Sequence, residues 1–159
     1  MKKGLAVLIL CLFPVLSAQA SLISFYVIET GLNEESGRNR HSTLWENAFM
    51  DVFFDSGFIV SNYPMLRLNE KPNVPIIEAC GFCVEEAIDA GVHYILIAQL
   101  DFSNAMRAPD EISLYVFKVI DHEIVYERQI AGRNYGSDRD ATEDMKKTIS
   151  PLVQFVRNL

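Results

Sequence analysis

The sequence has few of the features that mark a catalytic or cofactor-binding protein. It contains three cysteines and three histidines, and these do not form the paired ligand sets of a structural zinc site. No Gly-x-Ser-x-Gly motif is present, which argues against a hydrolase of the nucleophile-elbow type. Gly31 and Gly37 do not match a phosphate-binding glycine loop. The residues therefore predict no bound cofactor, no metal and no enzyme activity.

Basic residues are also scarce. The chain has 14 lysines and arginines against 21 aspartates and glutamates, a formal net charge of −7. Without Lys2 and Lys3, 12 basic residues remain against 21 acidic ones, and the net charge becomes −9. Nucleic acids and anionic lipid surfaces are bound by basic surfaces, so this balance argues against both as partners.

The first twenty residues have the three parts of a secretory signal. Lys2 and Lys3 precede an apolar run over 5–16, and the small residues of Ser17-Ala18-Gln19-Ala20 follow it. The run is too short to span a bilayer comfortably, which takes about 20 apolar residues. We therefore predict a signal peptide over 1–20 and a periplasmic or secreted product over 21–159. A retained N-terminal anchor is the alternative.

A lipid anchor is not expected. Cys11 lies early in the apolar run and follows Leu10 rather than a small residue. The mature chain, 21–159, has no linker or repeat and no second apolar run of membrane-spanning length. Its length suits one domain, which we predict to span all of it.

The chain is organised around one apolar stretch. Ala87 to Gly91 ends a predicted helix on a glycine, and Val92 to Phe102 follows as a nearly continuous apolar run. A strand with one wet face would alternate polar and apolar residues, and this run hardly does. It is therefore predicted as the central strand of a sheet that is covered on both faces.

The remaining elements alternate along the chain. Strands are predicted over 22–28, over 58–68 with an interruption near Pro64, and over 112–120 and 124–132. The first helix is predicted to end at Gly57 and to begin at Thr43, with Glu46 completing a capping box, or nearer Arg38. A second helix is predicted over 76–91. A third begins at a Ser137 or Asp138 cap and runs to the end of the chain. Pro151 predicts a kink, or a new helix capped by Ser150. Trp45 and Phe49 lie on the apolar face of the first helix and are predicted core residues.

These elements predict an α/β fold, in the wider sense that includes α+β. We expect a five-stranded mixed sheet in the order 2-1-3-4-5, with three helices packed on its faces. Right-handed crossovers in opposite directions from the first strand would place the first two helices on opposite faces of the sheet. The first three strands would be parallel, and the last two antiparallel. Pro64 and the polar residues near Glu127 indicate that 58–68 and 124–132 are the two sheet edges.

The pattern resembles a known group of periplasmic domains. The shared features are the export signal, a helix that ends at Ser56-Gly57-Phe58, and the junction from Ala90-Gly91 directly into Val92 to Ala98. In these features the chain resembles the α/β domain shared by the TolB amino-terminal domain, the CsgG curli-secretion family and the lipoprotein activators of peptidoglycan synthases. The resemblance implies an envelope protein that binds partners and has neither enzyme activity nor cofactor. The short 103–110 loop departs from the membrane-crossing hairpin of pore-forming members.

Cys80-Gly81-Phe82-Cys83 is the sharpest local motif. In an exported protein a C-x-x-C motif can be a thiol–disulfide exchange pair or a structural disulfide. Cys80 shares a helical face with Ile76, Ile77 and Val84, which predicts that it faces the core. We therefore interpret Cys80 and Cys83 as a structural pair, a possible disulfide, and keep redox exchange as the alternative function.

Other titratable groups favour structural roles. His93 is interpreted as a strand-end residue and His122 as a turn residue, and His41 has no neighbour at ligand spacing. The adjacent acids, Glu34-Glu35, Glu85-Glu86 and Asp110-Glu111, are expected on the solvated surface. The leading hypothesis is therefore a non-enzymatic, exported envelope protein that acts as an interaction or assembly module. Its expected partners are other envelope proteins, with self-association possible, and we expect them to dock at the edges, 58–68 and 124–132.

Overall fold

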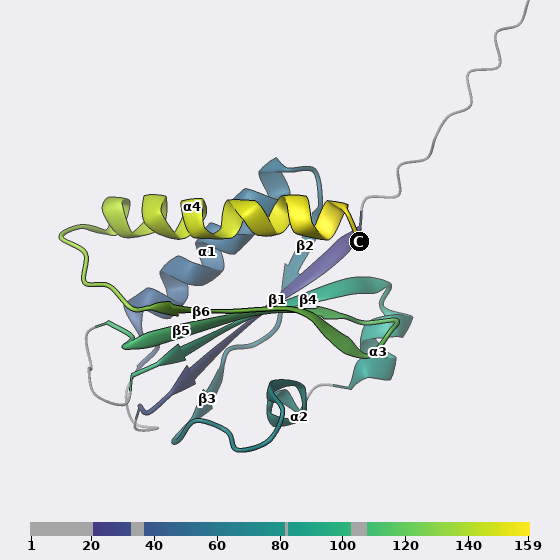
Figure 1. Cartoon of the computed structure of the whole chain (residues 1–159), viewed down its shortest axis with the longest axis horizontal. Coiled ribbons are helices and arrows are strands. Elements are labelled where there is room, and N and C mark those ends of the chain that lie inside the picture. Colours follow the sequence, from purple (N-terminus) through teal and green to yellow (C-terminus); the bar gives the residue numbers. More distant parts are fainter. Residues whose placement is uncertain (1–20, 33–36, 82, 103–107) are drawn as a thin grey trace, which may run out of the picture.

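The computed structural model describes residues 21–32, 37–81, 83–102 and 108–159. Within them the chain forms three layers, with one mixed sheet between two layers of helices (Figure 1). The predicted signal peptide lies outside the described residues. The sheet has six strands. They are β1 Leu22–Thr30, β2 Ile59–Asn62, β3 Leu66–Leu68, β4 Val92–Asp101, β5 Glu111–Lys118 and β6 Glu123–Ala131.

The strand order confirms the sequence prediction. The sheet runs β2-β1-β4-β5-β6, which is the predicted order, and β3 also pairs with β1. β1 is parallel to β2, β3 and β4, whereas β4, β5 and β6 form an antiparallel meander. The predicted second strand is thus two strands, β2 and β3, which are separated by Tyr63, Pro64 and Met65. Each of the two strands pairs with a different part of β1. Proline has no N–H to donate to a ladder, which explains the interruption.

The stretch after Gly91 is the central strand β4, as predicted. Residues from Tyr94 to Leu100 are buried on both faces of the sheet, and β4 pairs with β1 along almost its whole length. Gly91 adopts φ 74°, a left-handed conformation that favours glycine, and turns the chain from the preceding helix into the strand. Both faces of β4 are buried, so apolar residues are favoured at successive positions, which explains why the strand is almost continuously apolar.

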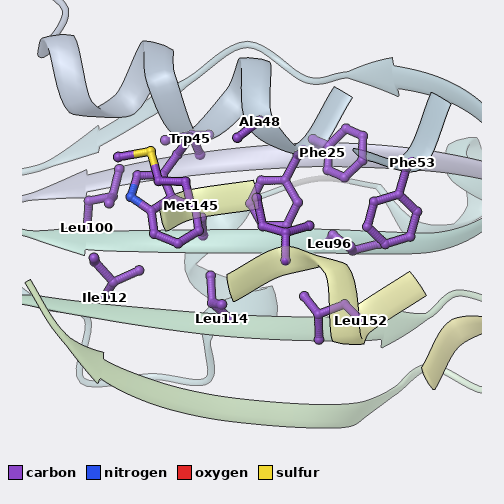
Figure 2. Close-up of a cluster of buried hydrophobic side chains, with 14 of the residues drawn as sticks. Phe25, Trp45, Ala48, Phe53, Leu96, Leu100, Ile112, Leu114, Met145 and Leu152 are labelled. Atoms are coloured by element: carbon purple, nitrogen blue, oxygen red, sulfur yellow. The ribbon is translucent and has the colours of Figure 1, made fainter. Parts of the chain in front are cut away.

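Two long helices cover one face of the sheet. They are α1, Arg40–Asp55, and α4, Asp138–Arg157. Figure 2 shows one cluster of buried side chains, formed by Trp45, Ala48 and Phe53 of α1, Phe25 and Leu96 of the sheet, and Met145 and Leu152 of α4. Trp45 and Phe49 are each about 1% exposed, which confirms that they are core residues.

The ends of these helices differ partly from prediction. α1 begins at Arg40, and Asn39 is its N-cap, with Asn39 Oδ1 accepting from the His41 N–H at 2.9 Å. The Thr43–Glu46 capping box is therefore wrong, because Glu46 turns to Arg38 and Asn62. Ser137 caps α4 as predicted. α4 continues through Pro151 as one helix, so no new helix starts at Ser150.

Two short helices cover the other face of the sheet. They are α2, Ile76–Cys80, and α3, Val84–Asp89, where the sequence predicted one helix over 76–91. Gly81 has φ 63° and ends α2 in a left-handed cap, which is why the helix breaks there. The structure therefore has four helices in the described residues, not three. The Tyr26 hydroxyl donates to the Cys80 carbonyl oxygen at 3.1 Å and ties α2 to the sheet.

A buried ion pair joins the carboxyl ends of β1 and β3. Glu29 lies just beyond the predicted strand over 22–28, but in the structure it is part of β1 and is fully buried. Its Oε2 accepts from Arg67 Nε at 2.9 Å, and its Oε1 accepts from the Asn39 N–H at 3.0 Å and from Ser42 Oγ at 2.5 Å. Arg67 is also mostly buried and donates to the Gly37 carbonyl oxygen at 3.1 Å. This network fixes the start of α1 against the sheet edge.

Arg67→Ala is expected to lower the free energy of unfolding by about 3 kcal/mol, because it leaves a buried carboxylate without its cation. Urea unfolding followed by circular dichroism measures the loss. The double variant Glu29→Gln with Arg67→Ala is expected to lose less than the single variant, since no buried charge is then left unpaired. An Arg67→Ala loss below about 0.5 kcal/mol, typical of a surface substitution, would contradict this role for the pair.

Candidate functional site

Cys80, the first cysteine of the predicted pair, is the last residue of α2. Its side chain is buried, as the sequence predicted. Burial raises the pKa of the Cys80 thiol to about 12. The reactive form of cysteine is the thiolate, so Cys80 is a poor nucleophile at neutral pH.

Cys83, the second cysteine, is exposed. It occupies the N-cap position of α3, and its thiol donates to Glu85 Oε2 at 3.3 Å. Both cysteines are free thiols in the structure. An exchange motif needs its first cysteine exposed at a helix N-terminus, and here the first cysteine is the buried one. The disulfide between Cys80 and Cys83 stays a prediction.

The three histidines lie apart from one another. His93 is exposed at the start of β4, and its Nδ1 accepts from the Leu22 N–H at 3.2 Å, which confirms a strand-end role. His122 lies in the β5–β6 turn with φ 55°, as predicted. His41 lies in the first turn of α1. Within the part of the chain that the structure describes, no group of three histidine, cysteine or acidic side chains is arranged to hold a metal ion.

The acidic pairs lie on the surface where the structure describes them. Glu85 and Glu86 are exposed on α3. Glu111 accepts from Lys71 Nζ at 2.6 Å, and this hydrogen bond raises the pKa of Lys71. Asp110 is exposed beside it. The pair Glu34-Glu35 lies outside the described residues. These contacts suit solvated ion pairs rather than acid–base chemistry.

The two sheet edges are where the sequence placed them. β2 and β3 pair with β1 along one side of the sheet, and β6 pairs with β5 along the other. Most residues of β2 and β6 are exposed. An exposed edge strand presents unpaired backbone groups that can bind an added strand. The geometry of both edges therefore allows β-strand addition.

A second surface feature was not predicted. Among the described residues, most of the exposed large hydrophobic side chains lie at one end of the molecule, which we name the apolar end. It consists of Phe54, Ile59, Ile88, Ile120, Ile124 and Leu159. Single exposed apolar residues are normal on protein surfaces, but their gathering at one end is not. Val74, 41% exposed, lies elsewhere, between β3 and α2.

The sheet register brings these residues to the same end. β1, β2 and β4 all begin there, since Leu22 pairs with both Ile59 and Val92, and β5 ends there. The C-termini of α1 and α4 meet at this end too, where Arg157 donates to the Ser56 carbonyl oxygen at 2.5 Å. Figure 1 shows β1 starting beside the C-terminus. The described chain thus begins at the apolar end.

A hollow of about 350 Å³ lies within the apolar end. Ile88, Val92, Tyr94 and Ile120 form its apolar walls, and Lys118 and His93 also line it. Lys118 is held by Asp121, with 2.6 Å between Nζ and Oδ2. Ile120 is 67% exposed, so its side chain is available to a partner. The arrangement suits binding of an apolar side chain rather than catalysis.

Sequence reasoning missed this end for a simple reason. Ile88 and Ile120 are spaced like core residues of a helix and a strand, and only the register of neighbouring elements shows that the described part of the chain leaves them exposed. The structure also has no helix, within its described residues, that is long and apolar enough to cross a membrane.

Comparison with solved structures identifies the fold. PelC from Paraburkholderia phytofirmans, solved as a dodecamer, shares 14% identity over 84% of this chain and 87% of its own, with a TM-score of 0.53. TolB from Acinetobacter baumannii shares 14% identity over 82% of this chain but only 27% of its own, with a TM-score of 0.45. The LpoB C-terminal domain from Escherichia coli shares 12% identity over 73% of this chain and 84% of its own, also at 0.45.

The likeness to PelC shows a shared fold. TolB was named in the sequence resemblance, but nothing in these comparisons supports the CsgG family specifically. No curated protein sequence matches the chain. One family model does, over residues 23–149, which is most of the described domain. The chain therefore belongs to the family that this model defines, whose description is "Uncharacterised protein".

Proposed function

We propose that the chain is an exported cell-envelope protein that works by binding other proteins and has no enzyme activity. The observation that carries this proposal is the apolar end, where exposed large side chains surround a hollow with apolar walls. Burying an isoleucine against a partner contributes about 1.5–3 kcal/mol, so a few such contacts support a specific complex. Protein partners suit this surface better than an anionic bilayer, given the acidic charge of the chain.

The free edges of the sheet offer a second means of contact. A strand of a partner can extend the sheet at β2 or at β6, because both edges are exposed. PelC, which shares the fold, was solved as a dodecamer. A second copy of this chain is therefore among the candidate partners, together with other envelope proteins.

The export part of the proposal depends on the first twenty residues. Their basic start, apolar run and small residues are typical of a secretory signal. Cleavage after Ala20 would release the domain over 21–159 into the periplasm or beyond. Anchoring by the leader or by lipid at Cys11 would instead hold the apolar end near a membrane.

Ile120→Asp is expected to weaken binding to the protein partner at least tenfold, because a charge replaces an apolar contact worth about 1.4 kcal/mol or more. Crosslinking in intact cells, followed by identification of the crosslinked proteins, measures complex formation. Sedimentation of the purified protein measures self-association. Val74→Asp is the matched control, since Val74 is also exposed but lies away from the apolar end.

The proposal fails if Ile120→Asp and Val74→Asp leave the same crosslinked species at the same level. It also fails if the unchanged protein gives no crosslinked species and sediments as a monomer. Because Ile120 is mostly exposed, its replacement is not expected to disturb the fold.

The alternative function is thiol–disulfide exchange by Cys80 and Cys83. A thiol reagent is expected to modify Cys83 quickly in the folded domain, 21–159, and Cys80 only after unfolding, because Cys80 is buried and its pKa is raised to about 12. Counting modified thiols by mass spectrometry tests this. Fast modification of both cysteines, together with reduction of insulin, would favour the exchange function over protein binding.

A further inference from the structure

A pocket of about 250 Å³ lies between β6 and α4, away from the apolar end. Ile112 of β5 and Ile130 of β6 form part of its wall, and they face each other across the antiparallel ladder. Asp144 of α4 lies on the opposite side. A water molecule takes about 30 Å³ of liquid volume, so the pocket has room for roughly eight of them. It therefore has the size of a small organic molecule.

One residue of the pocket lining carries a buried polar atom with no partner in the described part of the chain. Trp45 lines the pocket, is about 1% exposed, and its indole Nε1 makes no hydrogen bond within the described residues. In Figure 2 the indole nitrogen lies at the end of the core where Leu100 and Ile112 are drawn. A buried N–H without an acceptor destabilises the protein, so a hydrogen-bond acceptor bound in the pocket would relieve that penalty.

One of the two arginine side chains that line the pocket has no acidic partner among the described residues. Arg133 Nη1 lies 3.2 Å from both carboxylate oxygens of Asp144, and the Tyr135 hydroxyl donates to Asp144 Oδ2 at 2.7 Å. Asp144 is thus already occupied. Arg128 also lines the pocket and makes no hydrogen bond or ion pair with any described residue. The pocket therefore combines a free guanidinium with a free indole N–H, and both donate.

A smaller hollow nearby has room only for water, and it serves as a comparison for the pocket. It measures about 20 Å³, shares Tyr135 with the pocket, and is lined by His41, whose Nδ1 is also buried without a partner. That volume suits one water molecule. Burial lowers the pKa of His41, so its ring is neutral and adds no charge here. The larger pocket differs in its volume and in its unpaired cation, because Arg40 of the smaller hollow is paired with Asp138.

We propose that this pocket binds a small organic carboxylate. The carboxylate accepts from the Arg128 guanidinium and from the Trp45 N–H, and its apolar body packs on Ile112 and Ile130. Guanidinium groups match the planar geometry of a carboxylate and form charge-assisted hydrogen bonds with it. This site goes beyond the proposed protein-binding function and lies on a different surface.

The single tryptophan of the chain makes the test direct. NMR of the purified, isotope-labelled protein gives one indole N–H signal, which belongs to Trp45. Benzoate is expected to shift this signal in a saturable way. Benzyl alcohol, which lacks the charge, and inorganic phosphate, which lacks the apolar body, are expected to bind more weakly. Chloride at matched ionic strength is expected to leave the signal unchanged.

Arg128→Gln is expected to weaken benzoate binding at least about tenfold, as expected for a lost charge-assisted hydrogen bond. Arg139→Gln is the matched control, because Arg139 is exposed on α4, paired with Glu143, and does not line the pocket. The proposal is overturned if benzoate does not shift the indole signal, or if benzyl alcohol or phosphate binds as tightly. It is also overturned if both arginine variants bind benzoate equally.

Discussion

The structure depends on the parallel pairing of β1 with β4 and on its closure by helices on both faces. Each ladder residue from Ile23 to Thr30 has a partner in β4, and side chains on both faces of this pair are buried. Backbone groups here cannot reach water, so their hydrogen bonds depend on the ladder itself. The buried Glu29–Arg67 pair extends this closure to β3 and to the start of α1. Burial of apolar surface is the main favourable contribution to folding. Because both faces are covered, the centre of the sheet is not accessible to other molecules.

This closure confines interactions with other molecules to the periphery. The two edges, β2–β3 and β6, and the apolar end are the places where backbone or apolar groups of the sheet remain accessible. The pocket between β6 and α4 is peripheral as well, since it opens beside the edge strand. Substitutions at the edges and at the apolar end can change which partner the domain binds without disturbing its core, because exposed side chains contribute little to folding. The chain shares the fold of PelC, and fold alone does not assign a function.

The sequence predicted the centre of the structure better than its periphery. The strand after Gly91, the helix crossovers, the strand order and the burial of Trp45 and Cys80 follow from strong apolar patterns, and the structure has them. The break at Gly81 and the Asn39 cap depend on single residues whose local geometry competes with periodicity. The predicted strand over 22–28 stops short of Glu29, because the burial of Glu29 depends on Arg67, which lies far away in sequence. The apolar end and the pocket between β6 and α4 are formed by residues that are close in space but distant in sequence, so no local sequence pattern predicts them.

Hydrogen exchange of backbone amides in the native protein tests the central claim most directly. If the closed β1–β4 pair is the core on which the fold depends, its amides exchange only through global unfolding, with the same free energy as urea unfolding gives. Amides of β2 and of the outer strand β6 exchange through smaller openings at lower free energy. The account is contradicted if β4 amides exchange as readily as those of β6, because the centre of the sheet would then open by itself.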